Sequence, residues 1–316
     1  MDVLTHHRFR RWVTRALRLG LCAKLLVACE APSAPESLFE SQEMSAEMVN
    51  NSGTDESDVD ADRELEYLST VEGAWVHYSQ VSTCVDIGSS LEQYNRSLYT
   101  VRVTEREHGA LLERWEACEI DLTPVISVRA RVPEALRSSV YPLETKGGLI
   151  VGQAPSQRYQ SAPIVELWGV EMEQALIESM PDSAEDERIY DMDEDDRVGV
   201  TLEIGDACLA YMAQRRITTY QGTFTAPDTI EGEALSVTEQ FIIDASAPIC
   251  KTSYQTRSNP ARSHFERIRV DGRGGSINLD LDGDGDVSCE ELSVGRDLLF
   301  IERLEITDLD NMSCQR

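Results

Sequence analysis

Apolar and polar residues alternate in short stretches along most of the chain after about residue 66. Residues 97–104, Ser-Leu-Tyr-Thr-Val-Arg-Val-Thr, follow this period of two, and residues 124–132 repeat it. Successive side chains of a β-strand point to opposite faces, so each stretch predicts a half-buried strand. Residues 74–81 are rich in β-branched and aromatic side chains and predict another strand. The remaining strand candidates are residues 110–120, 148–151, 164–170, 198–204, 209–218, 221–226, 234–243 and 265–270.

Many short strands without long helices between them predict a mainly β protein. An antiparallel sheet closed as a barrel or stacked as a sandwich fits this pattern, and both alternatives stay open. A short helix is predicted at residues 132–137, because Pro133 suits the first helical position. Gly73-Ala74-Trp75 resembles the G-x-W opening of lipocalin-like barrels, which hold a small apolar ligand, although a Trp at a strand start is more commonly a core residue.

The chain is strongly acidic. Its 316 residues include 57 acidic and 29 basic residues, for a net charge of −28. Nucleic acids are polyanions, so this charge disfavours them as partners and favours the binding of cations. The length predicts one large or two modest domains.

One acidic stretch has the spacing of a metal-binding loop. Residues 280–291 read Asp-Leu-Asp-Gly-Asp-Gly-Asp-Val-Ser-Cys-Glu-Glu, with Asp at positions 1, 3 and 5, Gly at position 6 and Glu at position 12. The segment resembles the twelve-residue calcium loop of EF-hand proteins, which implies Ca²⁺ as a cofactor. The ligands that it implies are Asp280, Asp282, Asp284, the backbone carbonyl of Asp286, Ser288 through a water molecule, and both oxygens of Glu291. The alternative is an Asp/Gly-rich surface turn.

The residues around this loop predict a single loop rather than paired EF-hands. The Gly-rich residues 272–275 disfavour an entering helix, whereas residues 289–294 predict an exit helix that Gly295 ends. Calcium sensors couple two loops to open a hydrophobic groove, so a lone loop predicts a structural clasp.

A second acidic segment, residues 178–197, carries Asp at 191, 193 and 195, which is the same 1-3-5 spacing. Position 6 is Asp196 rather than Gly, and position 12 is Leu202 rather than Glu. A solvated acidic loop and a weak second cation site at 191–202 both stay open.

The N-terminus has the pattern of an export signal. Residues 1–28 carry six basic residues and one Asp, and residues 19–28 are mostly apolar. The end of this stretch, Leu26-Val27-Ala28-Cys29, resembles the lipobox of bacterial lipoproteins, which implies acylation of Cys29 and an anchor in the membrane. The whole chain loosely resembles uncharacterised bacterial lipoproteins. Because Lys24 interrupts the apolar stretch, a cleaved signal peptide without a lipid and a basic amphipathic helix remain alternatives.

The predicted domains follow from these segments. Residues 1–28 are a lipoprotein signal peptide, and residues 29–65 are an acidic, disordered tether. Residues 66–270 are the β domain, and residues 271–316 hold the calcium loop and the C-terminal segment. Glu30 is not the Asp that retains enterobacterial lipoproteins at the inner membrane, so the resemblance implies the outer membrane of the bacterial cell envelope.

The number and spacing of the cysteines are typical of an exported protein. Six cysteines follow the N-terminal stretch, and no pair has the C-x-x-C spacing of zinc or redox sites. Such cysteines in an exported chain predict disulfide bonds. The sequence does not fix their pairing; Cys289 with Cys314 is the pair that we expect first.

The sequence therefore predicts a lipid-anchored envelope protein whose calcium-stabilised β domain is a binding or structural module. No enzyme is expected, because the three histidines that follow the predicted signal peptide, His77, His108 and His264, lie outside any G-x-S-x-G or H-E-x-x-H motif. A secreted, calcium-supported hydrolase and a lipocalin-like carrier of a small apolar ligand are the alternatives. A protein or small-molecule partner is not identified.

Overall fold

The computed structural model describes residues 71–86, 90–105, 110–123, 130–151, 157–206, 208–251, 255–273, 277–299 and 314. The predicted signal peptide, Cys29 and the predicted tether lie outside the described residues. No described helix is long and apolar enough to cross a membrane.

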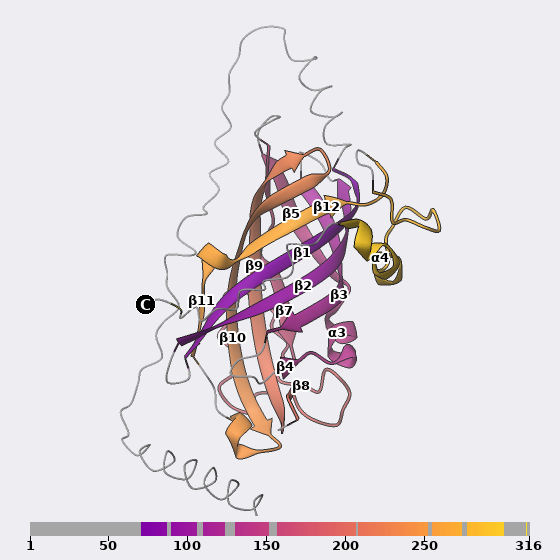
Figure 1. Cartoon of the computed structure of the whole chain (residues 1–316). Coiled ribbons are helices and arrows are strands. Elements are labelled where there is room, and N and C mark those ends of the chain that lie inside the picture. Colours follow the sequence, from indigo (N-terminus) through magenta and orange to yellow (C-terminus); the bar gives the residue numbers. More distant parts are fainter. Residues whose placement is uncertain are drawn as a thin grey trace, which may run out of the picture. The chain divides into compact units, whose positions relative to one another are not determined.

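Twelve strands form one antiparallel sheet (Figure 1). They are β1 (Gly73–Asp86), β2 (Ser90–Glu105), β3 (Ala110–Leu122), β4 (Ala130–Arg131), β5 (Leu143–Val151), β6 (Arg158–Gln160), β7 (Ile164–Trp168), β8 (Val200–Ile204), β9 (Cys208–Ala226), β10 (Thr229–Ala245), β11 (Gln255–Ser258) and β12 (His264–Arg269). The helices are short: α3 (Glu134–Val140), α4 (Cys289–Gly295) and the 3₁₀ turns η3 (Pro248–Lys251), η4 (Pro260–Arg262) and η5 (Arg296–Leu299).

The strand pairings lead around a ring. They run from β10 through β12, β1, β2, β3, β5, β6 and β9, and β9 pairs again with β10. The link through β6 is narrow, because β6 pairs through three residues on each side. Beyond β6, strand β7 continues along β9, and no ladder joins β7 to β5 among the described residues. The sheet is thus open along this seam.

The interior of the ring is filled by side chains that alternate with the strand period. Trp75 and Val81 of β1, Val101 of β2 and Trp115 of β3 point inward and are buried with Phe265 of β12. The intervening residues of β1 point outward, and the C-terminal segment covers them. Both faces of β1 are therefore buried, which explains why residues 74–81 have few charged side chains.

The predicted mainly β, antiparallel fold with short helices is confirmed, but several strands are longer than the sequence pattern indicated. The strands predicted at 209–218 and 221–226 are one strand, β9. Gly222 lies inside β9 opposite Gly232 of β10. A Cβ atom on Gly222 would lie 2.6 Å from the carbonyl oxygen of Glu231 and 2.8 Å from the Phe265 ring, so glycine here permits close packing rather than a break.

Three cysteine pairs lie at disulfide distance. Cys118 of β3 pairs with Cys289 at the start of α4, with 5.1 Å between their Cα atoms. Cys84 pairs with Cys314, and Cys208 pairs with Cys250. The expected Cys289–Cys314 pair is therefore wrong. The start of α4 packs against β3, and the Cα atoms of Cys314 and Cys84 of β1 lie 5.8 Å apart, so nearness in sequence was no guide to nearness in space.

Candidate metal centre

The acidic loop at residues 280–291 brings its first three Asp side chains together. One carboxylate oxygen from each of Asp280, Asp282 and Asp284 lies within 4.8 Å of the others. Backbone N–H groups orient the first carboxylate, because Gly283 and Gly285 donate to its two oxygens at 2.7 and 2.9 Å. Both glycines have a left-handed backbone, with φ of 78° and 84°. Glycine adopts this conformation without steric cost, so the sequence suits the turn.

The end of the loop is the start of α4. Ser288 is the N-cap residue, and Glu291 completes a capping box with it. One carboxylate oxygen of Glu291 accepts the backbone N–H of Ser288, and the other accepts the N–H of Leu281, both at 2.8 Å. These bonds, with that from Ser288 first, hold the pKa of Glu291 below its usual value, so the side chain is ionised at neutral pH.

The predicted ligand set is only partly assembled. The three Asp carboxylates converge, whereas Glu291 is not in their cluster and is bonded to the two ends of the loop. The Asp286 side chain accepts the N–H of Val287, which leaves its backbone carbonyl as the group that the EF-hand resemblance assigns to the ion. The predicted exit helix is confirmed as α4, which ends at Gly295. No helix leads into the loop among described residues 270–273 and 277–279.

Apolar residues on both sides of the loop dock it onto the sheet. Leu279, Val287 and Leu292 are each at most 2% exposed and pack against the outward side chains of β1 and against Leu98 of β2. The Cys118–Cys289 pair fixes the start of α4 to β3, and an Arg296–Glu119 ion pair adds a surface contact. Figure 1 shows α4 beside the strands of this part of the sheet.

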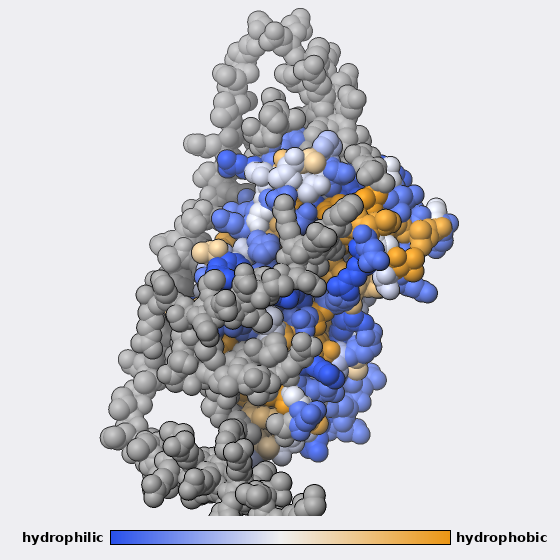
Figure 2. Space-filling view, viewed as in Figure 1, coloured by the Kyte–Doolittle hydropathy of each residue, from blue (hydrophilic) through white to orange (hydrophobic). Residues whose placement is uncertain are grey.

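The surface around the loop carries both apolar and hydrophilic side chains. In Figure 2 apolar side chains reach the surface in the region of α4, among a mostly hydrophilic face. Among the described residues of this C-terminal segment, the large exposed apolar side chains are Leu281, Val294 and Leu298.

The second acidic segment forms a similar loop. The carboxylates of Asp191, Asp193 and Asp195 also come within 4.8 Å of one another. The N–H groups of Asp195 and Asp196 donate to the two oxygens of Asp191 at 3.2 and 2.9 Å. Burial raises the pKa of Asp193, and one of its oxygens is buried without a hydrogen-bond partner among the described residues. Thr201 donates its N–H to the other oxygen at 2.8 Å.

The interior of the folded sheet holds a charged network that the sequence analysis missed. Arg267 of β12 is 1% exposed and donates to Glu113 of β3, which is 0% exposed, at 2.7 Å. The hydroxyl of Tyr159 donates to Glu113 and accepts from Arg267 at 3.0 Å. The guanidinium also lies 4.9 Å from the centre of the Trp115 ring. A buried pair of this kind is tolerated because each charge has several partners. Leu111, Glu113 and Trp115 alternate on one face, a pattern that could have indicated an inward acid.

His77 belongs to the same network. Nε of Arg267 donates to Nδ1 of His77 at 3.3 Å, so Nδ1 is the unprotonated nitrogen and Nε2 carries the proton. Burial first, and then the charge of Arg267, lower the pKa of His77 well below 6.5. The ring is stacked on Phe265 and surrounded by other aromatic rings. His77 is thus a neutral core residue. Of the other four histidines, His264 is exposed on β12, and His6, His7 and His108 lie outside the described residues.

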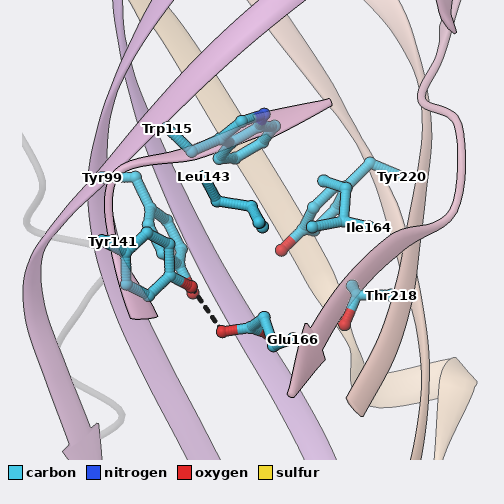
Figure 3. Close-up of a pocket in the computed structure, with 8 residues that line it drawn as sticks. All are labelled: Tyr99, Trp115, Tyr141, Leu143, Ile164, Glu166, Thr218 and Tyr220. Carbon is cyan, nitrogen blue, oxygen red and sulfur yellow. Dashed lines mark hydrogen bonds between the residues drawn. The ribbon is translucent and has the colours of Figure 1, made fainter. Parts of the chain in front are cut away.

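A small pocket lies at the open seam of the sheet, between the start of β5 and β7 (Figure 3). A second buried ion pair borders it: Arg216 of β9 donates to both oxygens of Glu166, and the Tyr141 hydroxyl donates to Glu166 as well. The lining residues are Tyr99, Trp115, Tyr141, Leu143, Ile164, Glu166, Thr218 and Tyr220. The pocket has room for about one water molecule.

Comparisons of the chain with protein-family models, with curated proteins and with solved structures found no match.

Proposed function

We propose that this protein is a lipid-anchored protein of the bacterial cell envelope and that residues 280–291 bind one Ca²⁺ as a structural clasp on its β domain. The observation that carries the proposal is the convergence of Asp280, Asp282 and Asp284 in a loop with glycines at its two left-handed positions. The β domain then acts as a binding or structural module.

The donor set suits calcium. It consists only of oxygen, and Ca²⁺ prefers six to eight oxygen ligands. The three Asp carboxylates would hold one side of the ion, and the carbonyl of Asp286 and a water on Ser288 would supply two more oxygens. Glu291 would supply two oxygens after exchanging its bonds to Leu281 and Ser288 for the ion. The ion would offset the repulsion among the converging carboxylates.

The packing of the loop favours a clasp over a sensor. A sensor opens a groove when its paired loops bind calcium. Here Leu279 and Val287 are already buried against β1 and β2, and Cys289 is tied to β3. Calcium would therefore fix a loop that is already docked. Extracellular modules bind calcium with a Kd on the order of 10⁻⁴–10⁻³ M. At ~1 mM calcium and a Kd of ~0.1 mM, binding adds about 1.4 kcal/mol to the free energy of unfolding.

Thermal unfolding of the full chain with 1 mM calcium and with EGTA tests the clasp. Calcium should raise the Tm by about 2–4 °C, which is the shift that 1–2 kcal/mol gives in a protein of this size. Glu291→Gln should abolish the rise, and Glu290→Gln is the matched control, because Glu290 is the exposed neighbour outside the ligand positions. Equal melting curves of the wild-type protein in calcium and EGTA would contradict the proposal.

Fractionation of cells tests the anchor. The Cys29→Ala variant lacks the thiol that a lipid would modify, so it should move from the membrane fraction to the soluble fraction. Ser33→Ala, in the same segment, serves as the control and should leave the protein with the membranes. Retention of the Cys29→Ala variant in the membrane fraction would argue against lipidation.

The packed interior bears on the alternative of a ligand carrier. A carrier of a small apolar molecule needs a cavity of several hundred Å³. Aromatic side chains and the Arg267–Glu113 pair occupy the described interior. The structure therefore gives this alternative no support.

A further inference from the structure

Arg102 of β2 lies under the acidic loop. A Cβ atom on Gly285, the sixth residue of the loop, would lie 3.7 Å from Nη1 of Arg102. This nitrogen is buried and has no hydrogen-bond partner among the described residues. A buried N–H of a charged group without a partner costs stability unless nearby negative charge offsets it. The loop supplies that charge, because residues 280–291 include six acidic residues and no basic residue.

The neighbours of Arg102 in the sheet also favour negative charge beside its guanidinium. Arg102 lies directly opposite Arg114 of β3, so the two arginines share one face. Like charges in this position destabilise a sheet. Arg114 is exposed and keeps its water, whereas Arg102 is partly buried. An anionic loop over Arg102 relieves the repulsion and satisfies a cation that water reaches poorly.

The geometry points to Arg102 as an internal counter-cation that holds the loop in place without calcium and weakens its calcium affinity. This inference rests on the proposed calcium site and adds a residue that tunes it. In the calcium-free protein the guanidinium screens the repulsion among the Asp carboxylates. When the ion binds, the same positive charge repels it. Arg102 therefore shifts the site toward millimolar calcium and keeps the loop folded when calcium is scarce.

Calcium titration of the full chain by calorimetry tests the inference. Arg102→Met keeps an unbranched apolar stem and removes the charge. A unit charge about 10 Å from a divalent ion changes its affinity by about fourfold at a dielectric near that of water. The variant should therefore bind calcium about fourfold more tightly and should melt at a lower temperature than wild type in EGTA. Arg102→Lys retains the charge and should keep a Kd within about twofold of the wild-type value.

Arg114→Met is the matched control, because it removes the exposed arginine opposite Arg102. Solvent screens that charge, so the calcium Kd should change by less than about twofold. If Arg102→Met does not fold, Arg102→Gln provides the same comparison with a polar side chain. An equal or weaker affinity in the neutral variants overturns the role of Arg102 while leaving the calcium site standing. A wild-type protein that binds no calcium overturns both.

Discussion

The two acidic loops, residues 280–291 and 191–202, have the same left-handed backbone positions. They differ in their sixth and twelfth residues and in the groups that donate hydrogen bonds to their carboxylates. In each, the acids at positions 1, 3 and 5 converge to within 4.8 Å. In each, positions 4 and 6 have a positive φ: 78° and 84° at Gly283 and Gly285, 57° and 65° at Glu194 and Asp196. The 1-3-5 spacing of acids thus occurs with the same turn whether or not glycine is present.

The loops differ in the groups that donate hydrogen bonds to the Asp carboxylates. In the second loop Thr201 donates its N–H to Asp193 and its hydroxyl to Asp195, so the protein itself supplies donors. Its twelfth residue, Leu202, belongs to β8 and packs in a hydrophobic cluster. In the first loop the twelfth residue is Glu291, an ionised carboxylate. In the second loop one oxygen of Asp193 still has no partner among the described residues. We propose that the sixth and twelfth residues, rather than the spacing of the acids, decide which loop binds a cation.

The largest expected effect comes from the covalent tie of the first loop. The Cys118→Ala/Cys289→Ala double variant removes a link across 171 residues of sequence. Loss of a native disulfide typically costs 2–5 kcal/mol. We expect a loss of about 3 kcal/mol in denaturant unfolding, and protease cleavage within 280–291 before cleavage within 191–202.

Cys208–Cys250 provides the comparison for this variant. It spans only 42 residues and starts at β9, which pairs with β8 beside the second loop. A shorter covalent loop removes less entropy from the unfolded chain, so its loss should cost about 1 kcal/mol less. If cleavage within 191–202 came first in the Cys118→Ala/Cys289→Ala variant, the disulfide would not be what holds the first loop.

Substitutions at the sixth residue of each loop should have a smaller effect on the free energy of unfolding. Gly285→Ala places a Cβ on a left-handed residue and should lower the free energy of unfolding by about 1 kcal/mol. Asp196→Gly relieves a similar strain but gives the unfolded chain more freedom, so its net effect should stay within about 0.5 kcal/mol. Denaturant unfolding of both variants measures the difference. Equal losses in the two variants would mean that glycine is no better suited than Asp to this turn.

The smallest effect is a pH dependence confined to the second loop. Burial raises the pKa of Asp193, so the folded protein holds a proton there more tightly than the unfolded chain. Its charge therefore costs stability at neutral pH, and the cost fades as the pH falls through the folded pKa. Asp193→Asn should gain less than about 1 kcal/mol at pH 7, because the loop is partly exposed and solvent screens it. The gain should shrink toward pH 4, and a gain independent of pH would contradict this account.

Local patterns allowed the correct prediction of much of the sheet. The period of two in residues 97–104 and the β-branched residues at 74–81 identified β2 and β1, because alternation depends only on neighbours. β6 has three residues, too few to show a period. The sequence also gave no sign that Gly222 pairs with Gly232 inside a continuous strand, since that contact joins two strands.

For the candidate site too, features that depend on neighbouring residues were predictable, and contacts between distant residues were not. The convergence of Asp280, Asp282 and Asp284 follows from local spacing and was predictable. The docking of the loop was not, because Cys118 and Leu98 lie far from it in sequence. The buried Arg267–Glu113 pair was missed because charged residues usually face solvent, and only the apolar neighbours of Glu113 on its face mark it as inward.

Calorimetric titration of calcium into the full chain, with one Asp→Asn variant in each loop, tests whether residues 280–291 bind the ion. We predict one ion per chain with a Kd on the order of 10⁻⁴ M, lost in Asp282→Asn and retained in Asp193→Asn. No binding by the wild-type protein, or binding that survives Asp282→Asn and disappears in Asp193→Asn, would contradict the assignment of the calcium site to residues 280–291.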